Sequence, residues 1–259
     1  LAAVKLHISV AHVEAGLRSF NREMPEEHNR VLTDHCADVL FCPTQTAVDN
    51  LAKEGIGTLA APPSDQKPSA PCVHWVGDTM YDAALMFAAM ASRRSQLPDT
   101  IVFEPKTYFL ATVHRPYNTD KPESLKSILH AFHELDGPVI FPVHPRTRAK
   151  LDQAGISKDA RISKNIHLID PVGYLDMLAL AKNAKAILTD SGGLQKEAYF
   201  LKVPCITLRP ETEWLETVQT GWNVLNINGK QKLFPYLGGH LLACTRSVWD
   251  KLGGFDPIY

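Results

Sequence analysis

The chain has 259 residues, of which 45% are apolar and 21% are charged, and its net charge at pH 7 is −1. This composition is typical of a globular protein, and it excludes a strongly basic nucleic-acid binder, a polybasic membrane-surface protein and a chain with a long apolar membrane span. The five cysteines are scattered without a CxxC pair, so we expect reduced thiols in a cytoplasmic protein and no zinc site.

Short apolar runs alternate along the chain with segments of helical periodicity. In the first hundred residues, the predicted strands are His7–Val13, Val39–Cys42 and Val73–Val76. "PEEHNRVLTDHC" is predicted to be a helix, because Pro25 suits the first helical position and the acids after it suit the positive end of the helix dipole. "TQTAVDNLAKEG" offers Thr44 as the N-cap of a second helix and Gly55 as its end.

The rest of the chain repeats the alternation more regularly. The six strands predicted there are Tyr108–Val113, Val139–Val143, Ile166–Ile169, Ala186–Thr189, Cys205–Leu208 and Asn223–Leu225. The segments "PESLKSILHAFHELDG", "GYLDMLALAKNA" and "GLQKEAYFLK" are predicted to be helices between them. This pattern predicts an α/β protein with parallel sheets, whose second part has the size of one complete Rossmann-like domain.

Two segments bear on where domains begin and end. "LAAPPSDQKPSAP", residues 59–71, is the strongest breaker segment, and an interdomain linker and a surface-loop insertion both explain it. The chain opens with "LAAVKLHISV", which resembles the last turn of a helix followed by a strand, and we expect an N-terminal fragment. About three strands before residue 100 predict an incomplete first domain.

A glycine pair follows one of the predicted strands. In "AILTDSGGLQKEA", the strand leads into Asp190, Ser191, Gly192 and Gly193, and a helix begins there. Ligands of open parallel sheets sit at the carboxyl ends of strands, glycines let the backbone approach closely, and a helix N-terminus favours an anion. The segment fits a phosphate site, with Glu197 one turn further on to bind ribose hydroxyls. A tight turn capped by Ser191 explains it equally well.

Three more polar side chains follow predicted strands. His114 in "ATVHRPYNTD" and His144 in "FPVHPRTR" end strands of one sheet, and Arg209 in "ITLRPETEWLE" ends another. A single histidine is more often structural, but two at equivalent strand ends near a phosphate-type loop favour a ligand site. Arg209 could meet phosphate charge or be a surface arginine.

"HVEAGLRSFNREMPEEHNR" gathers acids and bases where a strand gives way to a helix. Glu14 ends the strand, at the ligand edge of the sheet. Glu26 and Arg30 are spaced i, i+4 and share a helix face, where a plain surface pair would contribute little. Beside a cleft, Arg30 would keep the carboxylate ionised and able to accept a proton.

The order of these motifs resembles a known family. The matching segments are "HVEAGLRS", "PEEHNR", "CPT", "VGDTMYDA", "VHRPYNTD", "PVHPRT", "GYLDML", "TDSGGLQKEA" and "LRPETEW". Together they resemble the non-hydrolysing UDP-N-acetylglucosamine 2-epimerases over roughly residues 1–225. The resemblance implies the GT-B architecture, two Rossmann-like domains with the nucleotide sugar between them, and interconversion of UDP-N-acetylglucosamine and UDP-N-acetylmannosamine by elimination and re-addition of UDP.

The resemblance also implies roles for residues. By motif match, Glu14 and Glu26 are the acid–base carboxylates, Arg30 is a supporting cation, and His114 stabilises the departing UDP. The implied binding residues are Ser191, Gly192, Gly193 and Arg209 for the diphosphate, Glu197 for the ribose, and His144. A UDP-sugar is the implied substrate, with no cofactor, no metal, and no nucleic-acid or membrane partner. A role in cytoplasmic polysaccharide biosynthesis is implied, and a homodimer if the full-length pattern applies.

Two departures from the family pattern stand out. The family's first βα units are absent, with an arginine-containing phosphate loop and a "GDT" aspartate, so we expect an exposed sheet edge and a chain that is inactive or nearly so as an epimerase. After about Asn226 the pattern stops, and "YLGGHLLACTRSVWDKLGGFDPIY" resembles a piece of family-2 glycosyltransferases or is an unrelated helix. No DxD motif occurs in the chain.

We therefore predict three segments: a partial N-terminal Rossmann-like domain at 1–100, a nucleotide-binding Rossmann-like domain at 101–226 and a tail of different origin at 227–259. Three functions remain open: an epimerase, a UDP-sugar-dependent glycosyltransferase and a non-catalytic UDP-binding fragment. Glu14, Glu26 and Arg30 favour the epimerase, since a transferase would not need that carboxylate set.

Overall fold

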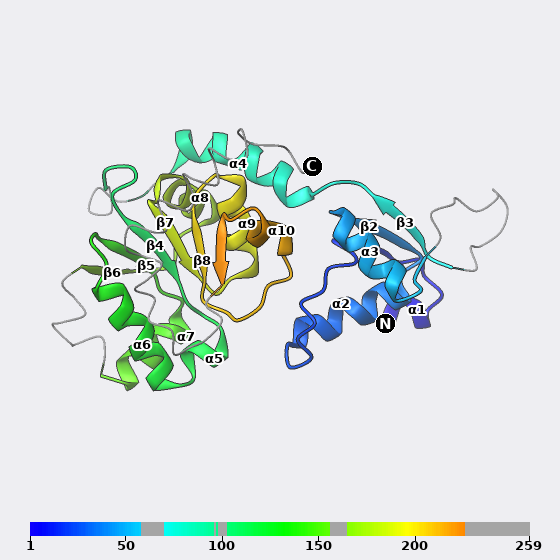
Figure 1. Cartoon of the computed structure of the whole chain (residues 1–259), viewed down its shortest axis with the longest axis horizontal. Helices are drawn as coiled ribbons and strands as arrows, with labels where there is room; N and C mark the ends of the chain where they lie inside the picture. The colour runs from blue at the N-terminus through cyan, green and yellow to red at the C-terminus, as the bar shows by residue number, and fades with distance from the viewer. Residues whose placement is uncertain (58–69, 96, 98–102, 156–164, 226–259) are drawn as a thin grey trace. The chain divides into compact units, whose positions relative to one another are not determined.

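The structure, a computed structural model, describes residues 1–57, 70–95, 97, 103–155 and 165–225 (Figure 1). It divides into two compact units, of which the first runs from Leu1 to Asp82 and the second begins at Ala83. The division falls inside helix α4 (Thr79–Arg94), whereas the predicted domain boundary follows residue 100. Most of the predicted linker at 59–71 and the whole predicted tail at 227–259 lie outside the described residues.

The first unit contains a small parallel sheet with the strand order β1-β2-β3. Its elements are α1 (Ala2–Lys5), β1 (Ala11–Val13), α2 (Pro25–Cys36), β2 (Val39–Cys42), α3 (Gln45–Lys53) and β3 (Cys72–Trp75). Leu40 and Cys42 of the central strand are fully buried, as are Ala47 and Leu51 of α3. The predicted N-cap is confirmed, because the Thr44 hydroxyl accepts a hydrogen bond from the Ala47 amide at 3.2 Å.

The predicted strand His7–Val13 is too long at its start, since only Ala11–Val13 pairs with β2. The backbone amide of His7 donates to the Val4 carbonyl, and that of Ile8 donates to the Ala3 carbonyl, both at 3.0 Å. These bonds hold the segment in the closing turn of α1, where His7 has a φ of 57°. An apolar run therefore starts as a helix end rather than as a strand.

The second unit contains a six-stranded sheet with the order β6-β5-β4-β7-β8-β9, in which every pairing is parallel. Its strands are β4 (Phe109–Thr112), β5 (Val139–Pro142), β6 (Ile166–Ile169), β7 (Ala186–Thr189), β8 (Cys205–Thr207) and β9 (Asn223–Leu225). This is the doubly wound order: β5 and β6 are added on one side of β4, and the chain then returns to add β7, β8 and β9 on its other side. All six predicted strands are confirmed, with small differences at their ends.

Helices cover both faces of this sheet (Figure 1). They are α5 (Pro116–Thr119), α6 (Pro122–His133), α7 (Pro145–Gln153), α8 (Tyr174–Asn183), α9 (Gly192–Phe200) and α10 (Leu215–Gln219). Phe109 and Ala111 of β4 pack in one core with α6 and α7, whereas Leu110 packs in the other with α8 and α9. The period-2 alternation of a strand thus divides β4 between two apolar layers.

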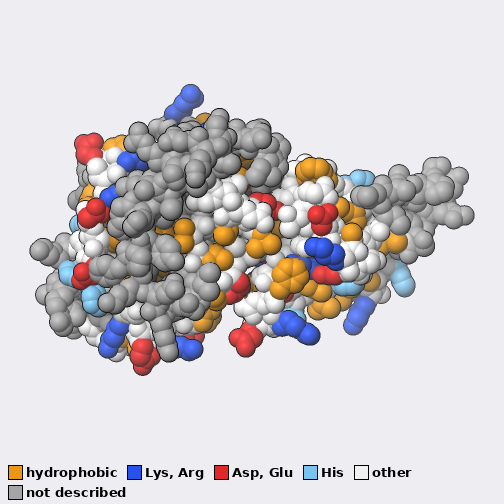
Figure 2. Space-filling view, in the orientation of Figure 1, with side chains coloured by type: hydrophobic (Ala, Val, Ile, Leu, Met, Phe, Trp, Pro, Cys, Tyr) orange, Lys and Arg blue, Asp and Glu red, His pale blue; other side chains and the backbone are white. Residues whose placement is uncertain are grey.

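Some charged side chains of this unit are buried, among them Asp190, Lys196 and Arg209, and others are exposed. On the face shown in Figure 2, the basic and acidic side chains of the described residues are interspersed, in keeping with the net charge of −1. None of the helices in the described ranges combines the length and the hydropathy needed to cross a bilayer.

Candidate active site

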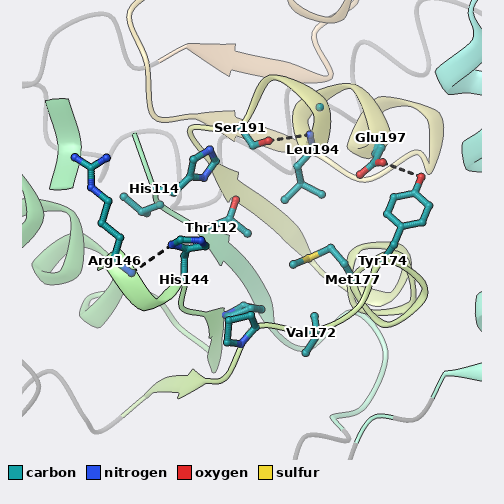
Figure 3. Close-up of a pocket in the computed structure, with 14 residues that line it drawn as sticks. Thr112, His114, His144, Arg146, Val172, Tyr174, Met177, Ser191, Leu194 and Glu197 are labelled. Atoms are coloured by element: carbon teal, nitrogen blue, oxygen red, sulfur yellow. Dashed lines mark hydrogen bonds between the residues drawn. The ribbon is translucent and has the colours of Figure 1, made fainter. Parts of the chain in front are cut away.

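A pocket of about 610 Å³ opens at the carboxyl ends of β4, β5 and β7, where the strand order of the larger sheet reverses (Figure 3). Its lining residues are Thr112, Val113, His114, Pro142, His144, Arg146, Pro171, Val172, Tyr174, Met177, Ser191, Gly193, Leu194 and Glu197. Loops leave the sheet in opposite directions at such a reversal, so a crevice forms without any distortion of the strands. An apolar lining with a few convergent polar groups is typical of a small-molecule site.

The turn after β7 forms one wall of the pocket. Ser191 is the N-cap of α9, and its hydroxyl accepts a hydrogen bond from the Leu194 amide at 3.4 Å, as predicted for a capping serine. Gly193 lines the pocket, whereas Gly192 is buried behind it. A Cβ on Gly192 would lie 2.5 Å from a carboxylate oxygen of Glu213, so no larger residue fits without a shift. The turn therefore presents the N-terminus of α9 to the pocket.

His114 lies beside this turn and is 45% exposed. Its Nδ1 is 3.2 Å from Oδ1 of Asp190, a carboxylate with no exposed surface. The same carboxylate accepts hydrogen bonds from the backbone amides of His114 and Arg115 and from the side-chain amide of Asn118. The β4–α5 turn is thus attached to the β7–α9 turn through one aspartate.

His144 faces the pocket from the start of α7 (Figure 3). It is the N-cap of that helix, and its Nδ1 accepts a hydrogen bond from the Arg146 amide at 3.3 Å. The Arg146 guanidinium in turn donates to both oxygens of Asp120, at 3.0 and 2.8 Å, and these bonds lower the pKa of the Asp120 carboxyl. The prediction that the two strand-end histidines meet at one ligand site is compatible with this shared pocket.

Glu197 lies on the opposite wall from His144 and is almost fully buried. Burial raises the pKa of its carboxyl, and the hydrogen bond that the Tyr174 hydroxyl donates to it at 2.9 Å opposes that shift. Burial, together with the Glu197 charge, raises the pKa of Tyr174 to about 12. The pair presents a carboxylate and a neutral phenol to the pocket.

Arg209 is not among the residues that line the pocket. Its side chain is fully buried, and Nη2 donates to Glu213 at 2.6 Å. Nε and Nη1 have no hydrogen-bond partner among the described residues. The alternative of a surface arginine is wrong, because the Arg209 side chain has no exposed surface.

The first unit carries the other predicted catalytic residues. Glu14 directly follows β1 and is half-buried, with a φ of 69°. A left-handed backbone costs a non-glycine residue energy, and such strain often marks functional positions. Glu26 is exposed in the first turn of α2, and Arg30 is half-buried one turn later.

A buried ionic network lies under the Glu14 loop. Asp34 has no exposed surface and accepts hydrogen bonds from the Gly16 amide and from Arg18, while His12 Nδ1 lies 2.6 Å away. Arg18 also donates to both oxygens of Glu54, at 2.7 and 2.8 Å, and its partners raise its pKa against the effect of burial. Paired in this way, the buried charges hold the loop in one conformation.

Sequence reasoning missed part of the pocket. It gave no role to Thr112, Arg146 and Tyr174, which line the pocket, or to Asp190, which is buried against His114. Thr112 and Asp190 could have been found with the strand-end rule already applied to their neighbours. Tyr174 and Arg146 each begin a helix directly after a loop, a position that carries no distinctive residue pattern.

A doubly wound domain with a capped helix N-terminus, two histidines and a buried carboxylate around one crevice defines the class of nucleotide-binding α/β proteins. A sequence profile described as UDP-N-acetylglucosamine 2-epimerase matches residues 1–234. The chain belongs to that family, as the motifs predicted. Among the residues that the structure describes, no three His, Cys, Asp or Glu side chains gather as metal ligands would.

Individual relatives agree with the family match. The chain is 51% identical over 234 residues to a UDP-N-acetylglucosamine 2-epimerase homolog of Methanococcus maripaludis, covering 90% of this chain and 62% of that protein. It is 47% identical to the UDP-2,3-diacetamido-2,3-dideoxy-D-glucuronate 2-epimerase of Pseudomonas aeruginosa, covering 87% and 58%. It thus spans about three fifths of the length of these curated relatives.

Solved structures show the same fold. The UDP-GlcNAc 2-epimerase of Methanocaldococcus jannaschii, in complex with UDP-GlcNAc and UDP, is 42% identical with a TM-score of 0.74, covering 97% of this chain and 71% of that one. The enzyme of Neisseria meningitidis bound to UDP-GlcNAc is 30% identical with a TM-score of 0.78, covering 100% and 68%. The predicted GT-B-like α/β class with parallel sheets is confirmed.

Proposed function

We propose that the protein interconverts UDP-N-acetylglucosamine and UDP-N-acetylmannosamine. The observation that carries the proposal is the pocket at the switch point of the larger sheet, in a chain of the epimerase family whose solved relatives hold UDP-GlcNAc. A diphosphate suits the N-terminus of α9, and a ribose suits the Glu197 carboxylate one turn further on.

The proposed chemistry is an elimination followed by an addition. A base removes the C2 proton, the electrons of that C–H bond form a C1–C2 double bond, and the bond from C1 to the UDP oxygen breaks. Delivery of a proton to the other face of C2, with return of the UDP oxygen to C1, gives the epimer. The negative charge that develops on the departing UDP must be met by donors such as Ser191, the amides of Gly192 and Gly193, and His114.

Glu14 and Glu26 are proposed as the groups that exchange the C2 proton, with Arg30 as a supporting cation. Left-handed backbone at Glu14 and the buried network beneath it support a fixed position for that carboxylate. Each well-placed acid or base contributes roughly 10²–10⁴ in rate. Arg209, which by motif match holds the diphosphate, is proposed to meet its charge after a side-chain movement, because it does not line the pocket and its Nε and Nη1 have no hydrogen-bond partner in the described residues.

A second candidate substrate comes from the comparison with Pseudomonas aeruginosa. The 47% identity to its UDP-2,3-diacetamido-2,3-dideoxy-D-glucuronate 2-epimerase supports the same reaction on a sugar with a C3 acetamido group and a carboxylate. The glycosyltransferase and the non-catalytic alternatives are not favoured, since the matching relatives are epimerases. A homodimer and a cytoplasmic location stay predictions, and light scattering tests the first.

The function is tested in two steps that do not depend on fast turnover. Calorimetry should detect UDP binding that Ser191→Tyr removes, because a tyrosine at the N-cap would fill the turn. The chain is then incubated in deuterated water with an equal concentration of each candidate UDP-sugar, and the C2 proton is followed by NMR. Deuterium at C2 with appearance of the epimer is expected, but only at a rate far below that of an ordinary enzyme, because the chain is predicted to be inactive or nearly so. Absence of UDP binding, or release of free sugar without exchange, would overturn the proposal.

A further inference from the structure

We propose that Asp190 is a positioning residue that holds the His114 imidazole in a single tautomer for the reaction. The inference rests on the proposed function, in which His114 meets the departing UDP. Asp190 belongs to the β7–α9 turn and His114 to the end of β4, so the pair joins strands on either side of the switch point.

The two carboxylate oxygens of Asp190 have different partners. Oδ1 lies 3.2 Å from His114 Nδ1 and 3.1 Å from the His114 amide. Oδ2 accepts from the Arg115 amide at 2.9 Å, from Asn118 Nδ2 at 3.0 Å and from the His114 amide at 3.1 Å. Every partner is a hydrogen-bond donor or can become one, and a fully buried carboxylate can only accept.

A carboxylate on Nδ1 decides which nitrogen carries the proton. The carboxylate 3.2 Å from Nδ1 favours the proton of neutral His114 on that nitrogen, and Nε2 is the nitrogen that Asp190 does not contact. Nε2 takes a proton from solvent before the reaction and donates it in a hydrogen bond to a phosphate oxygen of the departing UDP, while the buried carboxylate balances the charge of the imidazolium. The backbone bonds to the same carboxylate set the angle at which the ring enters the pocket.

Other charged and titratable groups surround the pair. His144 and Arg146 lie at the start of α7, and Glu197 belongs to α9. The groups around α5 are Arg115, Tyr117, Arg209 and Glu211. Among the described residues, Asp190 is the carboxylate in contact with the His114 ring, so the tautomer depends on Asp190.

Asp190→Asn makes a sharp test. An asparagine has one acceptor, and the orientation that keeps the most bonds turns its oxygen to Arg115 and Asn118 and its NH₂ group to His114. The NH₂ group donates to Nδ1 and so moves the ring proton to Nε2. Nitrogen-15 NMR of the full chain at pH 8, with His114→Gln to assign the signal, should show the Nδ1–H tautomer in the parent and Nε2–H in the variant.

Turnover gives the second readout. Asp190→Asn should lower kcat by roughly 10²–10⁴, with much less effect on KM, and should add little loss in a His114→Gln background. Asp136→Asn, which removes a carboxylate paired with Lys185 outside the pocket lining, is the matched control and should change neither readout.

An unchanged His114 tautomer in Asp190→Asn overturns the inference. So does an equal loss of kcat in the His114→Gln background, because that result would mean that Asp190 acts only on the shape of the turn. A tautomer change in a chain that neither binds UDP nor exchanges the C2 proton supports the Asp190–His114 pair and contradicts the proposed function instead.

Discussion

Gly192 shows how one missing side chain connects the pocket to the core. Its carbonyl accepts a hydrogen bond from the Trp214 indole at 3.0 Å, and the Glu213 carboxylate, paired with Arg209, packs where its Cβ would be. The Lys196 ammonium lies 3.4 Å from the centre of the Trp214 ring. The residue that would otherwise be read as a flexible loop glycine is therefore a close-packing position.

Gly192→Ala should destabilise the chain. Better helix propensity favours alanine by about 1 kcal/mol, whereas overpacking against a buried ion pair costs about 1–3 kcal/mol, so the loss is expected to win. Urea denaturation measures the free energy of unfolding. In a Glu213→Ala background the cost should shrink, and an undiminished cost there would show that the contact with Glu213 is not its cause.

Glu197 predicts a pH dependence of substrate binding. Burial raises its pKa, so on acidification it takes up a proton before an ordinary glutamate does and can no longer accept two hydrogen bonds from a ribose. Calorimetry with UDP-N-acetylglucosamine, whose diphosphate stays charged, should show affinity falling on acidification, at a higher pH than protonation of an ordinary glutamate would cause. Glu197→Gln should have a flatter profile, and parallel profiles would contradict the assignment.

The raised pKa of Glu197 also determines whether its carboxylate stabilises or destabilises the folded chain as the pH rises. A carboxyl with a folded pKa above its unfolded value costs stability once the pH rises through the folded pKa, because the folded state then buries a charge. Glu197→Gln should therefore raise the free energy of unfolding more at pH 7 than at pH 4. The opposite order would mean that the carboxylate is better stabilised in the folded chain than in the unfolded one.

Among the elements, α2 depends on a carboxylate that its own sequence does not mark as special. Glu27 is buried and accepts hydrogen bonds from the amides of Ser19 and Phe20 and from the Ser19 hydroxyl, at 2.9–3.1 Å. It also lies 3.6 Å from the guanidinium of Arg30. The start of the helix is thus attached to the loop before it, which sets where Glu26 and Arg30 can reach.

Glu27→Ala should cost about 1–3 kcal/mol of stability, since the Ser19 and Phe20 amides lose their acceptor. Glu23→Ala, an exposed carboxylate in the same loop, should stay within about 0.5 kcal/mol of the parent. Denaturant unfolding of the two variants makes the comparison. Equal effects would show that the Glu27 bonds contribute nothing beyond those of a surface residue.

Helix α4 is the longest described helix that the sequence patterns did not predict. Its 16 residues are alanine-rich, and the buried ones are Ala84, Ala88 and Ala91, at spacings of four and three. The stripe is helical, but alanine contributes little contrast between a buried and an exposed face. Propensity rather than hydrophobic periodicity was the signal available.

At the scale of the whole molecule, the positions of the pocket-lining residues predict which end of the chain UDP binding does not need. All the lining residues lie between Thr112 and Glu197, in a unit with its own core on both faces of the sheet. The family match extends past Asn226 to residue 234. Deletion of residues 235–259 should therefore leave UDP affinity within about twofold of the parent, since it removes no lining group.

Calorimetry with UDP on the shortened chain checks this. Binding lost together with the circular-dichroism signal would show that the deleted segment is needed for folding. Binding lost from a folded chain would show that it contributes to the site. Either result would contradict the independence of the pocket from this end of the chain.

The local signals were sufficient for the strands, most of the longer helices and the family, because apolar runs, caps and motif order are properties of neighbouring residues. Thr44 and Ser191 cap the helices expected of them. Contacts between residues far apart in the sequence could not be predicted from such local signals. His114 and Asp190 are 76 positions apart, and they meet only because β4 and β7 are adjacent in the sheet. Strand order, and with it the buried setting of Arg209, follows from how the layers pack rather than from any local pattern.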